Sequence, residues 1–170
     1  NFTGGGTLRM AADKTLKISG AVTGTTQVEM AGPVAGQDII TAAADSEGTF
    51  RLLSDSQYLS KSQRDGKTVW TVADKIPLTL EGGAHGTVTL EDGTELLPQS
   101  PILLVPGDRL AIIPDYGYKR NSVHINGQDI LDQLQDGVYT LTAEAASTLE
   151  VKFVPLEVPD FSGLVDSLPD

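Results

Sequence analysis

The 170-residue sequence contains no cysteine. Disulfide bonds, thiolate metal sites and a cysteine nucleophile are therefore excluded, although the cellular compartment is not fixed by this absence. Aromatic residues are also scarce, at 5% of the chain. No apolar run approaches the roughly 18–20 residues that a helix needs to cross a bilayer, so we expect no membrane insertion.

Basic residues are also few. The chain has 12 Lys and Arg against 23 Asp and Glu, which gives a formal net charge of −11. A protein this acidic is repelled by phosphate backbones and anionic lipid surfaces. We therefore expect no nucleic-acid partner.

Glycine and proline are present in quantity, with 18 and 9 residues, and long helical patterns are scarce. Short stretches of alternating apolar and polar residues fill the spaces between turn signals. The clearest example is Arg64-Asp65-Gly66, which lies between two alternating stretches and predicts a β-hairpin. The pattern predicts an all-β fold of two small antiparallel β-sandwich-like or β-sheet domains, with at most one short helix.

The second half of the chain contains two continuous apolar runs, Ile102–Val105 and Leu110–Ile113. Such runs are typical of central strands that are buried on both faces. Asn126-Gly127 predicts a further hairpin, and the spacing over 129–134 allows one or two helical turns. We place domains at 1–75 and 76–156, followed by an acidic tail or linker over 157–170.

Residues 78–154 contain a series of turns and strands in a recognisable order. It comprises Asp92-Gly93, Pro106-Gly107-Asp108, Gly117-Tyr118, Ser122–Gly127, Gly137–Leu141 and Leu149–Phe153. The series resembles the divergent internalin-B-type B-repeat modules of bacterial surface proteins, particularly those of Gram-positive gut organisms. The resemblance implies a small β domain that acts as a spacer or interaction unit, and it carries no catalytic residues.

No catalytic or metal-binding constellation emerges from the residues. His85 lies in a glycine-rich turn and His124 at an alternating strand position, and neither has further ligands at short spacing. No Gly-x-Ser-x-Gly elbow or phosphate-binding loop occurs. We therefore expect no enzyme activity, no catalytic residues, no cofactor and no metal.

Two functions remain open. The first is a non-catalytic structural or adhesive module of a bacterial secreted or cell-surface multidomain protein. The alternative is a carbohydrate-binding module of an exported glycan-active protein, because aromatic rings stack on the apolar faces of sugars. The candidate ligand-binding residues are Trp70, Tyr58, Tyr116 and Tyr118. We expect an extracellular or cell wall-associated monomer whose partner is a host or bacterial surface protein or a glycan.

Overall fold

The computed structural model describes residues 2–157 and divides into two compact units, Asn1–Lys75 and Ile76–Asp170. The predicted all-β fold is confirmed, since the only helix among the described residues is the short 3-10 turn η1, Leu131–Gln133. Residues 158–170, which make up most of the predicted tail, lie outside the described residues.

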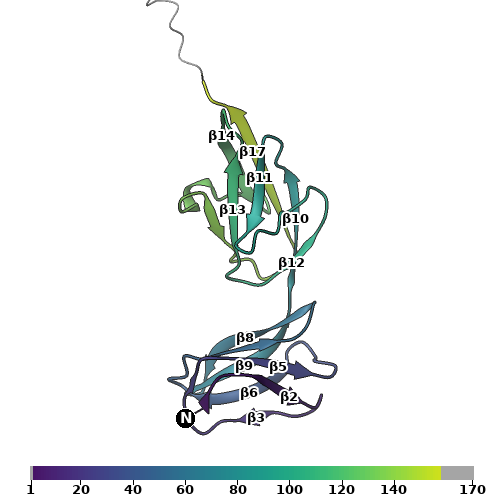
Figure 1. The fold of residues 1–170 in the computed structure, drawn as a ribbon, viewed down its shortest axis with the longest axis vertical. Helices are drawn as coiled ribbons and strands as arrows, with labels where there is room; N and C mark the ends of the chain where they lie inside the picture. The colour runs from purple at the N-terminus through teal and green to yellow at the C-terminus, as the bar shows by residue number, and fades with distance from the viewer. Residues whose placement is uncertain (1, 158–170) are drawn as a thin grey trace, which may run out of the picture. The chain divides into compact units, whose positions relative to one another are not determined.

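The first unit contains nine strands in three sheets (Figure 1). The strands are β1 (Phe2–Thr3), β2 (Thr7–Met10), β3 (Leu16–Lys17), β4 (Val22–Thr23), β5 (Thr25–Met30), β6 (Asp38–Ala43), β7 (Thr49–Leu52), β8 (Gln57–Arg64) and β9 (Lys67–Asp74). Their orders are β1-β4, β2-β5-β7 and β3-β6-β9-β8.

Strand pairing in the first unit is mostly parallel, which differs from the antiparallel expectation. β1 pairs with β4, β2 with β5, β5 with β7 and β3 with β6, all in parallel. The chain therefore winds as a coil, in which each turn, or rung, lies beside the preceding rung. Period-2 alternation reports only which side chains face the core, so the sequence pattern did not distinguish this coil from a set of antiparallel hairpins.

The register of the coil advances by either 20 or 24 residues, and Leu16 pairs with Ile40 after the longer step. Phe2 pairs with Val22 and Leu8 with Val28, which are steps of 20 residues, whereas Thr25 pairs with Thr49 after a step of 24. The first two rungs match residue by residue over 2–10 and 22–30. The steps also bring Gly4, Gly24 and Gly48 to the same corner of successive rungs.

Gly48 shows why this corner requires glycine. A β-carbon at Gly48 would lie 2.6 Å from the Val22 side chain and 2.9 Å from the Gly24 carbonyl oxygen. The close approach allows the Gly48 and Thr49 amides to donate to the carbonyls of Val22 and Gly24, each at 2.8 Å. Rungs therefore stack through backbone hydrogen bonds at the corner as well as within the strands.

The coil ends in the predicted hairpin of β8 and β9. Asp65 and Gly66 both have positive φ angles, 50° and 68°, as a two-residue hairpin turn requires. β9 pairs antiparallel with β6, which stops the parallel stacking. Trp70 on β9 is fully buried and meets Phe50 edge to face, with ring centroids 5.0 Å apart. The hairpin thus closes this end of the core.

The second unit packs a five-stranded sheet, β12-β10-β17-β14-β15, and a three-stranded sheet, β11-β13-β16, around one core. The strands are β10 (Ile76–Gly82), β11 (Gly86–Leu90), β12 (Ile102–Leu104), β13 (Arg109–Pro114), β14 (Tyr118–Ile125), β15 (Gln128–Asp129), β16 (Val138–Thr140) and β17 (Ser147–Pro155). Pairing is antiparallel except between β10 and β17. Both sheets contribute to the core, as in a sandwich.

The two apolar runs are not buried on both faces, so that prediction is wrong. β12 is an edge strand whose Leu103 is 45% exposed, and on β13 Ile112 is fully buried whereas Ile113 is 49% exposed. Each strand faces the core with alternate residues only. The opposite side chains are apolar but face solvent, which an apolar run cannot reveal.

Candidate ligand-binding surface

The four aromatic residues predicted to bind ligand lie in different environments. Trp70 is fully buried in the first core and packs against Phe50, so it cannot present a ring face to a sugar. This corrects its assignment as a binding residue. Tyr58, opposite Ala73 in the β8–β9 hairpin, is half-buried. Of the four residues, only Tyr116 and Tyr118 lie close to each other.

Tyr116 and Tyr118 flank Gly117 in the connection between β13 and β14. Tyr116 is fully exposed, whereas Tyr118 is half-buried against the core of the second unit. The Tyr118 amide donates to the Asp115 carbonyl at 3.0 Å, which closes a tight turn. Gly117 adopts a φ of 85°, a left-handed conformation that favours glycine. The turn thereby holds the two tyrosines on either side of Gly117.

His85 completes this group from a separate loop. Its ring stacks on Tyr118 with centroids 4.3 Å apart and planes 6° from parallel. The Asp115 amide donates to the His85 carbonyl at 2.9 Å, so the two loops are joined by backbone. We call His85, Tyr116 and Tyr118 the aromatic cluster. Sequence reasoning missed the part played by His85, because nothing local connects it to a residue 33 positions away.

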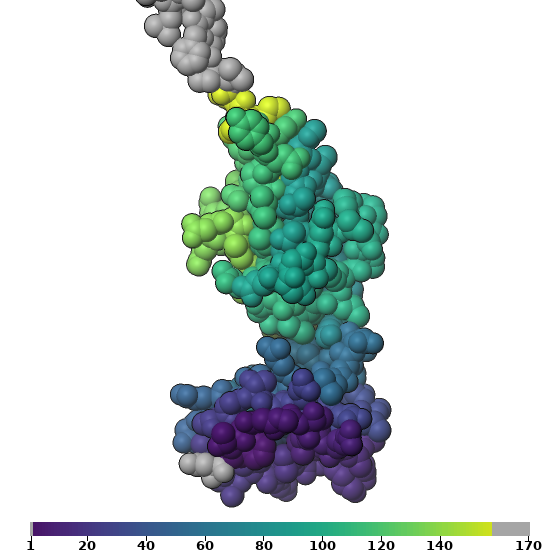
Figure 2. Space-filling view, viewed as in Figure 1, coloured from purple at the N-terminus to yellow at the C-terminus, as the bar shows by residue number. Residues whose placement is uncertain are grey.

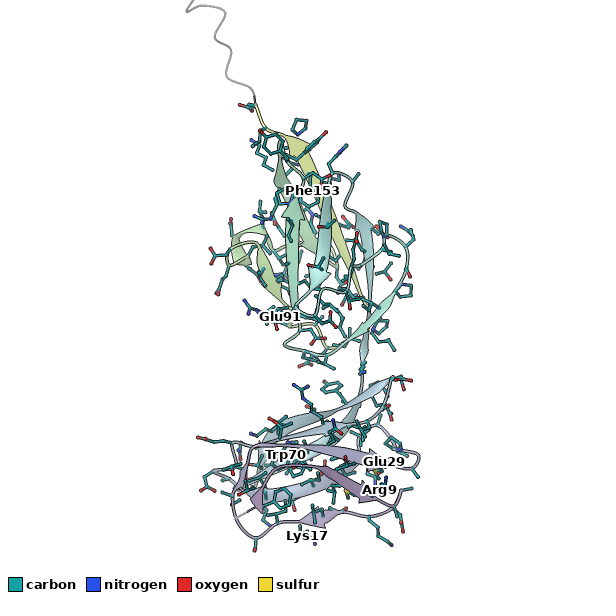
Figure 3. The ribbon with its side chains drawn as sticks, in the orientation of Figure 1. Arg9, Lys17, Glu29, Trp70, Glu91 and Phe153 are labelled. Atoms are coloured by element: carbon teal, nitrogen blue, oxygen red, sulfur yellow. The ribbon has the colours of Figure 1, made fainter. Side chains whose placement is uncertain are left out.

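The surroundings of the aromatic cluster combine apolar and charged groups. Leu156 is 51% exposed, and its amide donates to the Gly117 carbonyl at 2.8 Å. Phe153, labelled in Figure 3 on β17, is largely buried, and its ring packs directly against Gly86. Asp115 in this connection and Lys119 at the start of β14 are exposed. An aromatic surface with a polar rim is a common arrangement at binding sites.

A shallow hollow lies elsewhere on the second unit, beside η1. It is lined by polar and apolar side chains that include Asn126, Gln128, Gln133, Tyr139 and Thr142. The Tyr139 and Thr142 hydroxyls lie 3.2 Å apart and are partners for each other. The Asn126 amide is held by Ser147 and by the Thr148 backbone. These polar groups serve the fold, so the hollow is a weaker candidate than the aromatic cluster.

An ionic network with partly shielded members lies in the first unit. The Thr71 hydroxyl donates to Asp38 at 2.6 Å, and the Arg64 guanidinium bonds the same carboxylate oxygen at 2.7 Å. The Thr71 hydrogen bond, and then Arg64, hold the pKa of Asp38 below its ordinary value of 3.8 despite some desolvation. The network braces β6, β8 and β9 and leaves no carboxylate poised for acid–base chemistry.

The part of the chain that the structure describes brings together no three His, Asp or Glu side chains able to hold a metal ion. His124 is half-buried on β14, opposite Asp129 and Glu150 on its two neighbouring strands, while His85 stacks on Tyr118. Between residues 2 and 157 there is also no helix with the length and apolar character needed to cross a membrane.

Comparison with known proteins adds no relative to this picture. No protein-family model matches the sequence, and searches of curated proteins and of solved structures give no significant match.

Proposed function

We propose that this protein is a non-catalytic structural or adhesive module of a bacterial secreted or cell-surface multidomain protein. Its partner is a protein or glycan outside the cell, and the aromatic cluster is the surface through which it binds. The resemblance of residues 78–154 to B-repeat modules favours the same role. Function cannot follow from fold alone, so the proposal depends on how the side chains are used.

The observation that carries the proposal is that the buried hydroxyl side chains of Thr26, Ser46, Thr68 and Ser147 are hydrogen-bonded to backbone. Thr26 accepts from the Gly5 amide, and Ser46 accepts from Val22 and donates to Ala43. Thr68 donates to the carbonyls of Ala43 and Ala44, and Ser147 donates to that of Ala145. Each of these four buried hydroxyls bonds backbone in a turn or between strands. An enzyme site, in contrast, aims such groups into a cleft.

The test is a binding and turnover screen of the purified chain. The chain is passed over immobilised extracellular proteins and a glycan array, and the same samples are analysed by mass spectrometry for released products. We expect binding without product release. Loss of binding in Tyr116→Ala but not in Tyr58→Ala would place the contact at the aromatic cluster. Release of a product from any glycan or protein would overturn the non-catalytic assignment.

A carbohydrate-binding role is the second candidate, and the stacked pair favours it. The His85 side chain is exposed while its ring lies flat on Tyr118, and Tyr116 is free in solvent. Flat, exposed rings suit the apolar face of a pyranose. Binding confined to glycans, and lost in both His85→Ala and Tyr116→Ala, would make this the primary function. Binding confined to proteins would exclude it for the sugars tested.

A further inference from the structure

The two ends of the parallel coil in the first unit differ. At one end the β8–β9 hairpin covers the core, and at the other the first rung, β1, β2 and β3, lies at the margin of all three sheets. In Figure 1, β8 and β3 are at opposite ends of the four strands that include β6 and β9. The coil is therefore capped at one end and open at the other.

Burial across the rungs shows the same difference. In the second rung Val22, Val28 and Ile40 are buried, with exposed fractions of 1% or less. Their register partners in the first rung, Phe2, Leu8 and Leu16, are only half-buried. Figure 2 shows the N-terminal segment, in dark purple, on the surface of the unit. The apolar interior of the coil thus continues up to a face that the described residues leave partly uncovered.

The hydrogen bonds identify the groups that are free on this face. In a parallel ladder, the amide and carbonyl of one residue point to one neighbouring strand, and those of the next residue point away. Gln27 donates to the Gly6 carbonyl, so Gly6, Leu8 and Met10 face β5. The backbone groups of Thr7 and Arg9 therefore point outward.

The other two strands of the rung repeat this arrangement. The Phe2 and Gly4 amides donate to Ala21 and Thr23, and the Ile18 amide donates to Thr41. Alternation then directs the backbone groups of Thr3 and Lys17 outward. Three short edges, each with its outward backbone groups unpaired among the described residues, border one apolar core end. Repeat folds cover such ends with another repeat or with a dedicated cap.

We infer that the open end of the first unit is a stacking surface for a further parallel rung, which precedes Phe2 in the same polypeptide. The existing steps set its dimensions: 20 residues before Phe2 and Leu8 and 20 to 24 before Leu16, with apolar side chains beside these three residues and a glycine beside Gly4. Arg9, which forms an exposed 2.9 Å ion pair with Glu29, favours a polar or acidic neighbour on the outer face (Figure 3). The first unit is then the terminal cap of a longer coil. This inference does not depend on the ligand-binding role of the second unit.

The test extends the complete chain at its N-terminus with a duplicate of residues 1–20, which reproduces the 20-residue step of β1 and β2. We expect the melting temperature of the first unit to rise by about 4–8 °C, the shift that about 1 kcal/mol of added stability produces in a domain of this size. The amides of Thr7, Arg9 and Lys17 should exchange with solvent at least about tenfold more slowly than in the original chain. An extension with the same residues in shuffled order is the control.

Arg9→Pro supplies a matched variant, because proline removes the outward amide and is tolerated at an edge. It should leave the stability of the original chain nearly unchanged and cancel the gain in the extended chain. Leu8→Pro, which breaks pairing to β5, should destabilise both.

Three results would overturn the inference. In the first, the duplicate gives no more protection or stability than the shuffled extension. In the second, Arg9→Pro leaves the gain intact, so the contact does not use the open edge. In the third, the original chain sediments as a dimer whose association protects Thr7 and Arg9. A second copy of the chain would then occupy the surface.

Discussion

Small residues at the corner of the coil set how closely its rungs approach. The missing side chain of Gly48 leaves room for Val22 and for two backbone hydrogen bonds from the third rung to the second. Val22 is itself bonded through its amide to the buried Ser46 hydroxyl at 3.0 Å. Packing and hydrogen bonding are therefore coupled at one point, where a single added methyl group disturbs both.

Gly48→Ala should destabilise the first unit by about 1–3 kcal/mol, as overpacking typically does. The added β-carbon must displace Val22 or the Gly24 carbonyl, both of which are held by the rungs. Urea denaturation followed by circular dichroism measures the effect. Thr49→Ala, at the neighbouring exposed position, is the control and should cost much less. Equal effects of the two substitutions would contradict the packing explanation.

Trp70 tests the distinction between a core residue and a binding residue. Its indole is fully buried, and its Nε1 has no hydrogen-bond partner among the described residues. Trp70→Ala should lower the free energy of unfolding of the first unit by about 3–5 kcal/mol. Calorimetry measures the loss, and binding by the aromatic cluster should survive it. A stable variant that has lost ligand binding would restore Trp70 to the binding surface.

Asp38 should give the first unit an acid-dependent stability. Its folded pKa is lowered by Thr71 and then Arg64, so its contribution is complete above the unfolded value near 3.8. That contribution is lost as the pH falls through the lower, folded value. The Asp38 side chain is 39% exposed, so solvent screening limits the effect to less than about 1 kcal/mol. Asp38→Asn should unfold with a weaker pH dependence between pH 6 and pH 3 in urea titrations, and an unchanged dependence would count against the network.

At the scale of elements, β13 places neighbouring apolar residues on opposite faces, one toward the core and one toward solvent. Ile112 faces the core and Ile113 faces solvent, although the two side chains are identical. Ile112→Ala should cost about 2–5 kcal/mol, whereas Ile113→Ala should cost less than about 0.5 kcal/mol. Thermal unfolding of the two variants compares them directly. Similar losses would mean that Ile113 is also covered.

Turns were the elements that the sequence predicted best. Asp65-Gly66 and Asn126-Gly127 both form tight turns with two positive φ angles, as their residue types require. Strand partners were harder to predict, because alternation assigns a face and not a neighbour. The match of residues 2–10 to residues 22–30, with Gly4 aligned on Gly24, is the signal that could have indicated the coil.

The aromatic cluster likewise depends on spatial neighbours that local sequence does not predict. Tyr116 and Tyr118 follow a strand-ending proline, so a loop position could be predicted from local sequence. Their relation to His85 depends on how the loop before β11 meets the loop before β14, which no local pattern contains. Trp70 was misassigned for a related reason, since a lone tryptophan on a strand fits either a core or a surface.

At the scale of the whole molecule, the apolar core is divided in two. Among residues 2–157, the second core consists of residues between Leu78 and Phe153, and the first of residues between Phe2 and Val72. Neither requires side chains from the other to complete it. Each unit thus meets the basic condition for folding alone.

Residues 76–157 expressed alone should therefore fold and show the binding that we propose for the aromatic cluster. Dispersed amide resonances and a cooperative thermal transition would establish the folding. Binding by this fragment, with Tyr116→Ala as the negative control, would place the contact within the second unit. A fragment without a cooperative transition would show that the second core depends on the first unit.

The parallel pairing of β10 with β17 has a consequence for mechanical load. The first strand of the second unit lies beside the last through five residue pairs, from Leu78↔Ser147 to Gly82↔Val151. Because both strands run the same way, the entry of β10 and the exit of β17 are at opposite ends of this pairing. Tension applied through the two ends shears all five pairs together and does not unzip them singly. The second unit is thus arranged to resist stretching.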